Sequence, residues 1–332
     1  MNGITKEISN KVANMSFVCA LLVAFIHIGY EAAPGTFGHW LSLFVRTVVA
    51  QIAVPFFFVV SGFFLAKHID EPNWWRRAVF QRVRTLLIPF LIWNLVEVAL
   101  WFILNGWPNV SKAILVKTLV ADFGLNPIKL AAVPPLWYVR ALLLFVVISP
   151  LLLKQIRSQG GFVFICLFVV PLLLRVSIAD SRWTNLWRFF IPIDGLFYFC
   201  LGMKLNPTRL DVGRKWAVLS FVMWLAMIVI SSGHESILTA AAIPFLIVAV
   251  WQFIPSRRWY PIFAGSSFAI YVMHWTWGGL LKNAMSASPW FTEHIGSASL
   301  LRWSGAVGLS ILIWWLLRRF CPRVAGVVFG GR

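Results

Sequence analysis

The sequence reads LLVAFIHIGYE from Leu21 to Glu31. An unbroken apolar run leads into His27, and a carboxylate follows four residues later. Ionisable groups inside a membrane-spanning segment are costly and usually face a bundle interior or a wet cavity. Residues four apart share one face of a helix, so we expect Glu31 to orient the His27 imidazole and raise its basicity. A structural histidine that is hydrogen-bonded to a neighbouring helix is the alternative interpretation.

The composition is typical of a membrane protein. Of the 332 residues, 60% are hydrophobic and 12% are charged, whereas soluble domains average roughly 45–50% and about 25%. The chain also contains 19 Trp and 29 Phe residues, which suit interfacial belts and lipid-facing surfaces. A soluble globular domain is therefore not expected.

Ten apolar runs are candidates for membrane spans, because about 20 apolar residues cross a bilayer core. Backbone polar groups in lipid must be satisfied within the segment, so each run is predicted to be a helix. The predicted spans are residues 13–33, 41–66, 84–104, 135–153, 161–178, 187–204, 215–232, 237–254, 262–282 and 300–317. The sequence thus predicts an all-α polytopic protein, a bundle of about ten transmembrane helices in which residues 1–332 form a single domain.

The positive charges alternate between the two sides of these spans. Nineteen of the 29 Lys and Arg residues lie in the tails and loops of one side, and five lie in the loops of the other. Positively charged loops stay in the cytoplasm, so we expect both termini to be cytoplasmic. The net charge of +18 then reflects topology, and nucleic acid is not an expected partner.

Among the charged side chains inside other spans, two are candidates for a role in a functional site. Glu97 shares a helix face with Asn94 and Trp101 in the third span, and either a buried ion pair or a direct catalytic role explains it. Arg140 lies just inside the fourth span. It either snorkels outwards or neutralises an acid or a developing oxyanion.

An arginine cluster lies between the second and third spans, in EPNWWRRAVFQRVRTLLIP, residues 71–89. One interpretation is a positive-inside anchor. Another is a cradle for the phosphates of an anionic cytosolic ligand, because Arg pairs with phosphate bidentately. The two interpretations are compatible, and both rest on Arg76, Arg77, Arg82 and Arg84. The chain has no zinc-ligand spacing, so no catalytic metal is predicted.

Six stretches together resemble the membrane acyltransferase family three. In chain order they are SFVCALLVAFIHIGYE (16–31), VPFFFVVSGFF (54–64), QRVRTLLIPFLIWN (81–94), PLWYVRALLLFVVISP (135–150), FYFCLGMKL (197–205) and SFAIYVMHW (267–275). The resemblance implies a ten-helix, multi-pass protein of the bacterial inner membrane. It also implies transfer of an acyl group, most often acetyl from cytosolic acetyl-coenzyme A, to a hydroxyl of a surface polysaccharide, a lipid-linked sugar or a similar acceptor.

The resemblance further assigns His27 the role of general base or acyl relay. The chain departs from the family pattern at one position. The family usually places an arginine eleven residues before the histidine, and this chain has Ser16 there. Lys11 points to nearly the opposite helix face and does not simply substitute. Either another arginine supplies the charge, or the chain belongs to a divergent branch.

The other matches are to residues with family roles in structure, donor binding or catalysis. A Ser-Gly pair lets two helices approach closely, a basic position precedes the third span, an aromatic pair opens the fourth, and Tyr and His recur late in the chain. These matches are Ser61 and Gly62, Arg82 or Arg84, Trp137 and Tyr138, and Tyr271 and His274.

The expected mechanism combines the placement of the ionisable residues with what the family resemblance implies. The arginines hold the donor phosphates, His27 takes the proton of the acceptor hydroxyl, and Arg140 or Tyr138 steadies the oxyanion. A covalent acyl-histidine relay is the variant. The alternative function is a membrane transporter or glycan flippase, since ten spans with buried charges also suit transport. The sequence leaves the acceptor, the acyl chain and the oligomeric state open, and a homo-oligomer is compatible with it.

Overall fold

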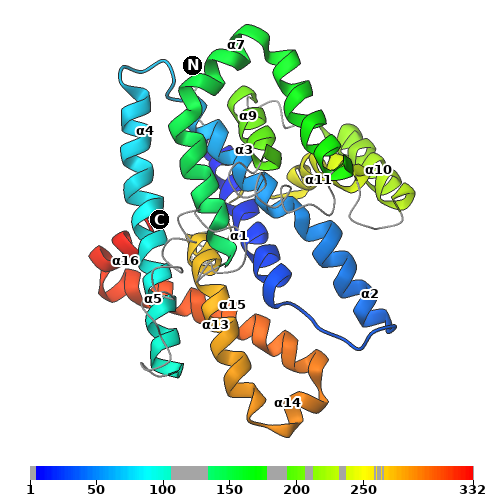
Figure 1. Ribbon diagram of the computed structural model, residues 1–332, viewed down its shortest axis with the longest axis vertical. Coiled ribbons are helices and arrows are strands. Elements are labelled where there is room, and N and C mark those ends of the chain that lie inside the picture. Colours follow the sequence, from blue (N-terminus) through cyan, green and yellow to red (C-terminus); the bar gives the residue numbers. More distant parts are fainter. Residues whose placement is uncertain are drawn as a thin grey trace. The chain divides into compact units, whose positions relative to one another are not determined.

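The computed structural model describes residues 5–105, 134–177, 193–205, 212–231, 237–257, 259, 263 and 265–331. These residues form helices joined by turns, and no strand occurs among them (Figure 1). The prediction of an all-α fold is confirmed for this part of the chain.

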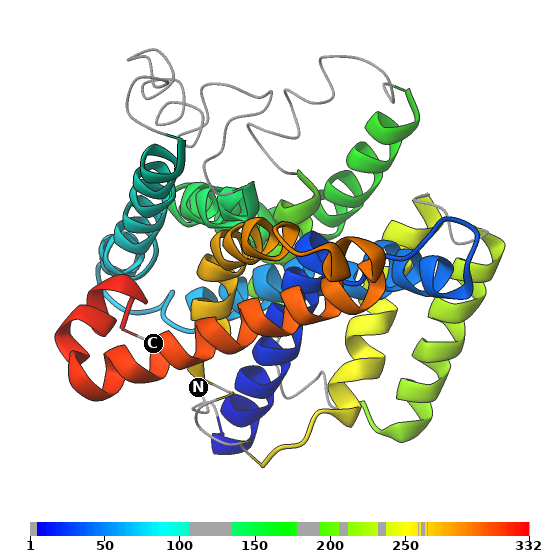
Figure 2. The same cartoon turned by 90° about the horizontal axis from the view of Figure 1, so that it is seen from below.

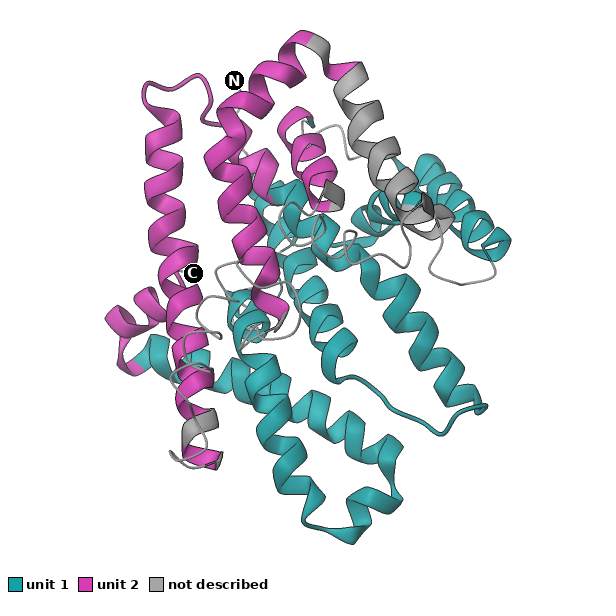
Figure 3. Cartoon of the chain, in the orientation of Figure 1, with its two compact units in different colours: residues 1–60, 205–319 teal, residues 61–204, 320–332 magenta. Residues whose placement is uncertain are grey.

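The chain divides into two compact units (Figure 3). Unit 1 comprises Met1–Val60 and Leu205–Arg319, and unit 2 comprises Ser61–Lys204 and Phe320–Arg332. The division falls inside one helix, α3 (Ala53–Ala66), and at the end of another, α15 (Ile295–Phe320). Neither unit is therefore a continuous piece of sequence.

Unit 1 is built around the packing of its first helix against a late one. Besides the parts of α3 and α15 that belong to it, its elements are α1 (Lys6–Ile28), α2 (Phe37–Phe44), η1 (Val45–Val49), η2 (Ala50–Ile52), α10 (Arg214–Ile230), α11 (Ile237–Phe253), α13 (Ser267–Ser286) and α14 (Pro289–Glu293). α1 packs along α13, and Figure 2 shows α10 and α11 side by side. The fully buried Ala20 and Ala24 cluster with Ile270 and Val307, so small residues let α1 lie close to α13 and α15.

A buried asparagine fixes the segment that leads into α13. The Asn14 side chain donates hydrogen bonds to the carbonyls of Pro255 and Arg257, both at 3.0 Å, and accepts one from the Trp259 N–H at 3.1 Å. Buried polar groups are costly unless they are hydrogen-bonded. The three bonds therefore anchor the segment after α11 to the cytoplasmic half predicted for α1.

Unit 2 is built around a long helix. Its elements are α4 (Trp74–Arg82), η3 (Val83–Leu87), α5 (Ile88–Asn105), η5 (Pro134–Leu136), α7 (Trp137–Ser177), α9 (Ile193–Lys204) and α16 (Pro322–Val328). α7 packs against both α4 and α9. α16 packs against α5, where the Trp93 indole N–H donates to the Val328 carbonyl at 3.2 Å.

Helices occupy all ten predicted spans where these are described, but not all meet the length and hydropathy needed to cross a bilayer. Among the described residues, five helices are long and apolar enough. They are Lys6–Ile28, Phe37–Ala66, Trp74–Leu100, Trp137–Ser158 and Ile295–Phe320. The membrane character of the chain is thus supported, while the count of ten spans and the cytoplasmic termini remain predictions. Residues 187–192 of the predicted span 187–204 lie outside the described residues.

The fourth and fifth predicted spans, 135–153 and 161–178, are parts of one helix, α7. The predicted loop between them is wrong, because helical backbone continues through it. Figure 1 shows that α7 is sharply bent, so its two halves run in different directions. The sequence near its middle contains adjacent glycines, Gly160 and Gly161, and glycine-containing pairs are a common cause of helix kinks.

Candidate functional site

α1 ends directly after His27, which places the two residues of the opening stretch differently from prediction. The Gly29 N–H donates to the Phe25 carbonyl at 2.9 Å, and the backbone then becomes extended. A Cβ at Gly29 would collide with that carbonyl oxygen. Glu31 therefore lies beyond the helix, and the prediction that it shares a helix face with His27 is wrong.

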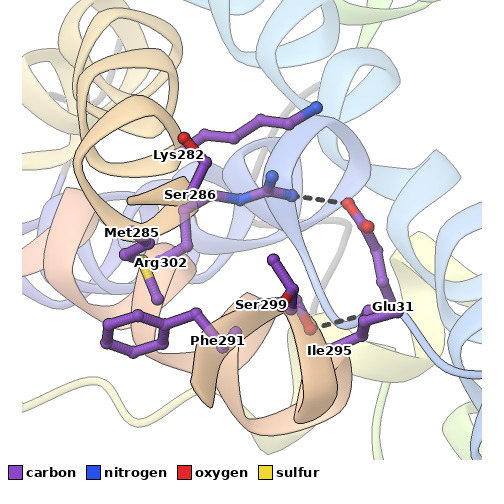
Figure 4. A pocket seen from close by; sticks show the side chains of 10 residues that line it. Glu31, Lys282, Met285, Ser286, Phe291, Ile295, Ser299 and Arg302 are labelled. Carbon is purple, nitrogen blue, oxygen red and sulfur yellow. Dashed lines mark hydrogen bonds and ion pairs between the residues drawn. The ribbon is translucent and has the colours of Figure 1, made fainter. Parts of the chain in front are cut away.

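Glu31 instead joins the end of α1 to α15. Its carboxylate accepts from Arg302 Nη2 at 2.6 Å, and its backbone N–H donates to Ser299 Oγ at 2.8 Å (Figure 4). The Arg302 side chain is buried, whereas about half of the Glu31 side chain is exposed. The ion pair fixes the chain just after His27.

His27 lies beside a second imidazole from α13. The ring centroids of His27 and His274 are 5.5 Å apart with a tilt of 30°, and the Trp275 ring stands edge-on to His27 at 5.9 Å. His27 is half-buried and His274 is fully buried. In the part of the chain that the structure describes, the His27 ring has no hydrogen-bond partner. The alternative of a structural histidine bonded to a neighbouring helix is therefore not supported there.

One hydrogen bond sets the tautomer of His274. Its Nδ1 lies 3.0 Å from the Ile270 carbonyl oxygen, which only accepts, so Nδ1 carries the proton. Nε2 is then left with a lone pair. That atom is buried and has no partner among the described residues. A buried acceptor without a partner is costly.

A glycine allows this close approach of α1 and α13. Gly278 follows His274 by one helical turn, and a Cβ there would lie 2.6 Å from Cγ2 of Ile28. Ile28 is itself buried and directly follows His27. The neighbouring Gly279 has no heavy atom within 4 Å of its would-be Cβ. The two adjacent glycines thus form a matched pair for mutagenesis.

We expect Gly278→Ala to lower both thermal stability and acyl transfer, because the new methyl group displaces Ile28 and with it the His27 turn. Overpacking of this kind typically costs about 1–3 kcal/mol. Gly279→Ala should be neutral or stabilise the helix by up to about 1 kcal/mol. Thermal unfolding and turnover measured on both purified variants check the prediction. Equal effects of the two substitutions would argue against close packing at this site.

Arg46 reaches the same helix end from η1. Its Nη2 donates to the Gly29 carbonyl at 3.4 Å, and its Nε is buried without a partner among the described residues. Ser16 lies roughly 16 Å away from His27 in the opposite direction along α1. Arg46 supplies positive charge near His27, but it does not take the place of the arginine that the family usually has at position 16.

Lys11 does not supply that charge either. Its Nζ donates to the Trp251 carbonyl at 3.4 Å and lies 5.5 Å from the centroid of the Trp251 ring. The ammonium is thus engaged on α11. The departure from the family pattern at Ser16 persists in three dimensions.

A second group of predicted residues comes together in unit 2. Ser61 Oγ and the Tyr138 hydroxyl form a hydrogen bond of 3.3 Å. Arg82 is half-buried and interacts electrostatically with Tyr138. A Cβ at Gly62 would collide with the Phe199 carbonyl oxygen, so glycine is required where α3 meets α9.

The other three arginines of the cluster are exposed. Arg77 donates to Glu71 at 2.9 Å, and Arg84 in the π-helical turn η3 lies 5.9 Å from the centroid of the Phe80 ring. A hydrogen bond from His68, together with the charge of Arg77, lowers the pKa of Glu71. The carboxylate therefore stays ionised at neutral pH and competes with any phosphate for Arg77.

Glu97 and Arg140 are half-buried in α5 and α7. Asn94, one turn before Glu97, is buried and donates to the Phe90 carbonyl at 2.8 Å. Tyr271 is buried, with its ring centroid 6.5 Å from that of His274. The catalytic roles assigned to Glu97, Arg140 and Glu31 and the structural role assigned to Tyr271 remain predictions.

Sequence reasoning missed three residues of this site. Arg46 and Arg302 lie inside predicted spans, but neither they nor Trp275 were predicted as site residues. Charged residues inside a span signal a function or a buried partner, so both arginines were detectable as candidates. Their partners were not, because Arg302 meets Glu31 across 271 residues of sequence.

Comparisons with known proteins identify the family of the chain. The family model described as Acyltransferase domain matches residues 14–319. The succinoglycan biosynthesis protein ExoH of Rhizobium meliloti (strain 1021) is similar to this chain, with 26% identity over 277 residues that cover 73% of this chain and 72% of that protein. No solved structure matches the chain significantly. The family predicted from the six stretches is confirmed.

Proposed function

Since the chain belongs to the Acyltransferase domain family, we propose that it moves an acyl group, most simply acetyl, from cytosolic acyl-coenzyme A to a hydroxyl of a surface polysaccharide, a lipid-linked sugar or a similar acceptor. Five apolar helices support a location in the membrane, and we propose the bacterial inner membrane. The similarity to a succinoglycan biosynthesis protein supports a glycan as acceptor. The observation that carries the proposal is the pairing of His27 with His274 at the end of α1.

His27 acts as the general base in this proposal. The acceptor hydroxyl donates its proton to the imidazole while its oxygen attacks the thioester carbonyl carbon. A carbon–oxygen bond forms, the carbon–sulfur bond breaks, and the proton passes from His27 to the departing coenzyme A thiolate. The lone pair on His274 Nε2 accepts a hydrogen bond that positions the hydroxyl or the imidazolium.

Charge that develops on the carbonyl oxygen needs hydrogen-bond donors that are already in place. Arg46 offers an unpartnered Nε at the same helix end as His27, which makes it a candidate in addition to Tyr138 and Arg140. An acyl-histidine relay remains the variant mechanism. In that variant His27 is acylated first, and the acceptor hydroxyl then attacks the acyl-imidazole.

The arginines of α4 and η3 hold the donor phosphates in this proposal. Arg76 and Arg84 are exposed, whereas Arg82 is half-buried beside Tyr138. We therefore assign the phosphates to the exposed pair and the fixing of the α4 end to Arg82.

Replacing Arg76 and Arg84 together with Gln should weaken coenzyme A binding roughly tenfold or more, since hydrogen bonds to charged groups contribute about 1.5–3 kcal/mol each. A double variant of Arg214 and Lys215, which removes two charges from the exposed start of α10, is the matched control. Calorimetric titration of the purified proteins measures both. Unchanged affinity in the first variant would move the donor site elsewhere.

The transporter interpretation rested on the number of spans and on buried charges. Membership of the acyltransferase family removes its main support. A direct test of the enzyme assignment is transfer of labelled acetyl from acetyl-coenzyme A to isolated glycan by the purified protein. Transport of glycan without any acylation would revive the alternative.

A further inference from the structure

A pocket of about 260 Å³ lies beside the last turns of α13 and Glu31, which follows the end of α1. Its walls are the last turns of α13, the short helix α14, the start of α15, and Glu31. Small-molecule sites span roughly 300–1,000 Å³, so this pocket is sized for a single small group. By the predicted topology, the loop between α13 and α15 faces away from the cytoplasm.

One side of the pocket is charged (Figure 4). Arg302 is buried, with only 9% of its surface exposed. Its Nη2 donates a hydrogen bond to the Glu31 carboxylate. Arg302 Nε is buried and has no partner among the described residues. The exposed Lys282 extends along the same side. With two cations and one carboxylate, the lining carries a net charge of about +1 at neutral pH.

The other side of the pocket is apolar. Phe291 and Met285 lie together opposite the ion pair in Figure 4, and Ile295 completes that wall. Ser299 Oγ already accepts the Glu31 N–H and donates to the Gly296 carbonyl. A flat apolar wall facing a rim of donors and acceptors suits a sugar ring, whose faces carry C–H groups and whose edges carry hydroxyls.

We propose that this pocket is a subsite for a sugar residue that bears a carboxylate. The carboxylate pairs with Lys282 and the free edge of Arg302, the hydroxyls bond to Glu31, and the ring packs on Phe291. The net charge of the lining matches one carboxylate better than a phosphate monoester, which carries about −1.5 to −2 at pH 7. The proposal rests on the proposed function only in calling this ligand part of the acyl acceptor.

The pocket does not hold the sugar that is acylated. Lys282 follows His274 by eight residues on α13, which is roughly 12 Å along the helix axis. A hydroxyl that reaches His27 must therefore belong to another unit of the same glycan. The subsite selects acceptors by the acidic sugar that neighbours the acylated one.

The test is a binding measurement on the full-length protein in nanodiscs without any acyl donor. The probes are trigalacturonate and its methyl ester, in which a methyl group on each carboxyl removes the charge. We expect the wild type to bind the free acid about five- to tenfold more tightly than the ester, because a partly screened ion pair adds to the binding free energy of the acid only. Lys282→Met should remove this preference, whereas the matched control Lys67→Met, at another exposed lysine, should keep it.

Three outcomes would overturn the proposal. Equal affinity for the acid and the ester would show that charge does not contribute to binding. A preference for the acid that persists in Lys282→Met would show that the carboxylate does not bind in this pocket. Displacement of the acid by glycerophosphoglycerol at equal concentration would assign the site to a phosphodiester lipid headgroup instead. The binding measurement contains no acyl donor, so it tests the subsite independently of acyl transfer. If the protein binds the acid tightly and selectively but does not acylate it when a donor is added, the proposed function is contradicted and the subsite is not.

Discussion

His27→Ala is expected to abolish acyl transfer while the protein keeps its expression level and thermal stability. General-base help contributes roughly 10²–10⁴-fold to rate, and the whole of it is lost with the imidazole. The ring contacts the rings of His274 and Trp275 and forms no hydrogen bond among the described residues. Contacts of this kind contribute about 0.5–1.5 kcal/mol each, so the fold should survive.

The matched control for this variant is His39→Ala. His39 lies on α2 of the same unit, and its ring stands against Trp40 at 5.7 Å. Turnover of labelled acetyl and thermal unfolding should be recorded for both variants. A folded His27→Ala protein with near-normal turnover would refute the catalytic assignment and make Glu97 or His274 the next candidate.

His274→Ala is expected to lower turnover by about 10²-fold, the lower end of what a positioned proton-transfer group contributes. Its ring centroid lies 5.5 Å from that of His27, and the hydrogen bond to the Ile270 carbonyl fixes its orientation. Coenzyme A affinity should not change, because the proposed phosphate ligands lie in unit 2. The effect should therefore appear in kcat rather than in binding of the donor.

His294→Ala is the matched control for that variant. His294 is an exposed histidine that stacks on Trp290 with ring centroids 4.7 Å apart. If His274→Ala loses activity only in proportion to its loss of folded protein, measured by thermal unfolding, then its role is structural. A fall in kcat at full stability assigns it to positioning within the reaction.

Composition and apolar run length were enough to predict the helical membrane fold, because a chain in lipid has few ways to satisfy its backbone. Run length failed at α7. A helix that bends keeps its hydrogen bonds through a polar segment such as Lys154–Gln159, so a break in the apolar pattern does not require a break in the helix.

The His27 and Glu31 pair shows where local spacing misleads. Positions four apart share a face only while the helix continues, and α1 ends at Ile28. Gly29 was the available signal, since glycine commonly follows the last turn of a helix. The true partner of Glu31, Arg302, is brought to it by the packing of α1 beside α15, which no local pattern encodes.

The resemblance to the acyltransferase family located residues that spacing alone could not connect. Ser61 and Tyr138 are 77 residues apart, yet they are hydrogen-bonded. His27 and His274 come from opposite ends of the chain and lie ring beside ring. The residue types and motif order identified these four, and the helix packing within each unit explains why they occur together.

The most direct measurement of the central claim is mass spectrometry of the surface glycan from three strains. One strain makes the wild-type protein, one makes His27→Ala at equal abundance, and one lacks the protein. We predict an acyl group on the glycan repeat of the wild-type strain only, with the other two strains giving identical unacylated masses. An acylated glycan in the His27→Ala strain, or equal masses in all three, would contradict acyl transfer by this protein through His27.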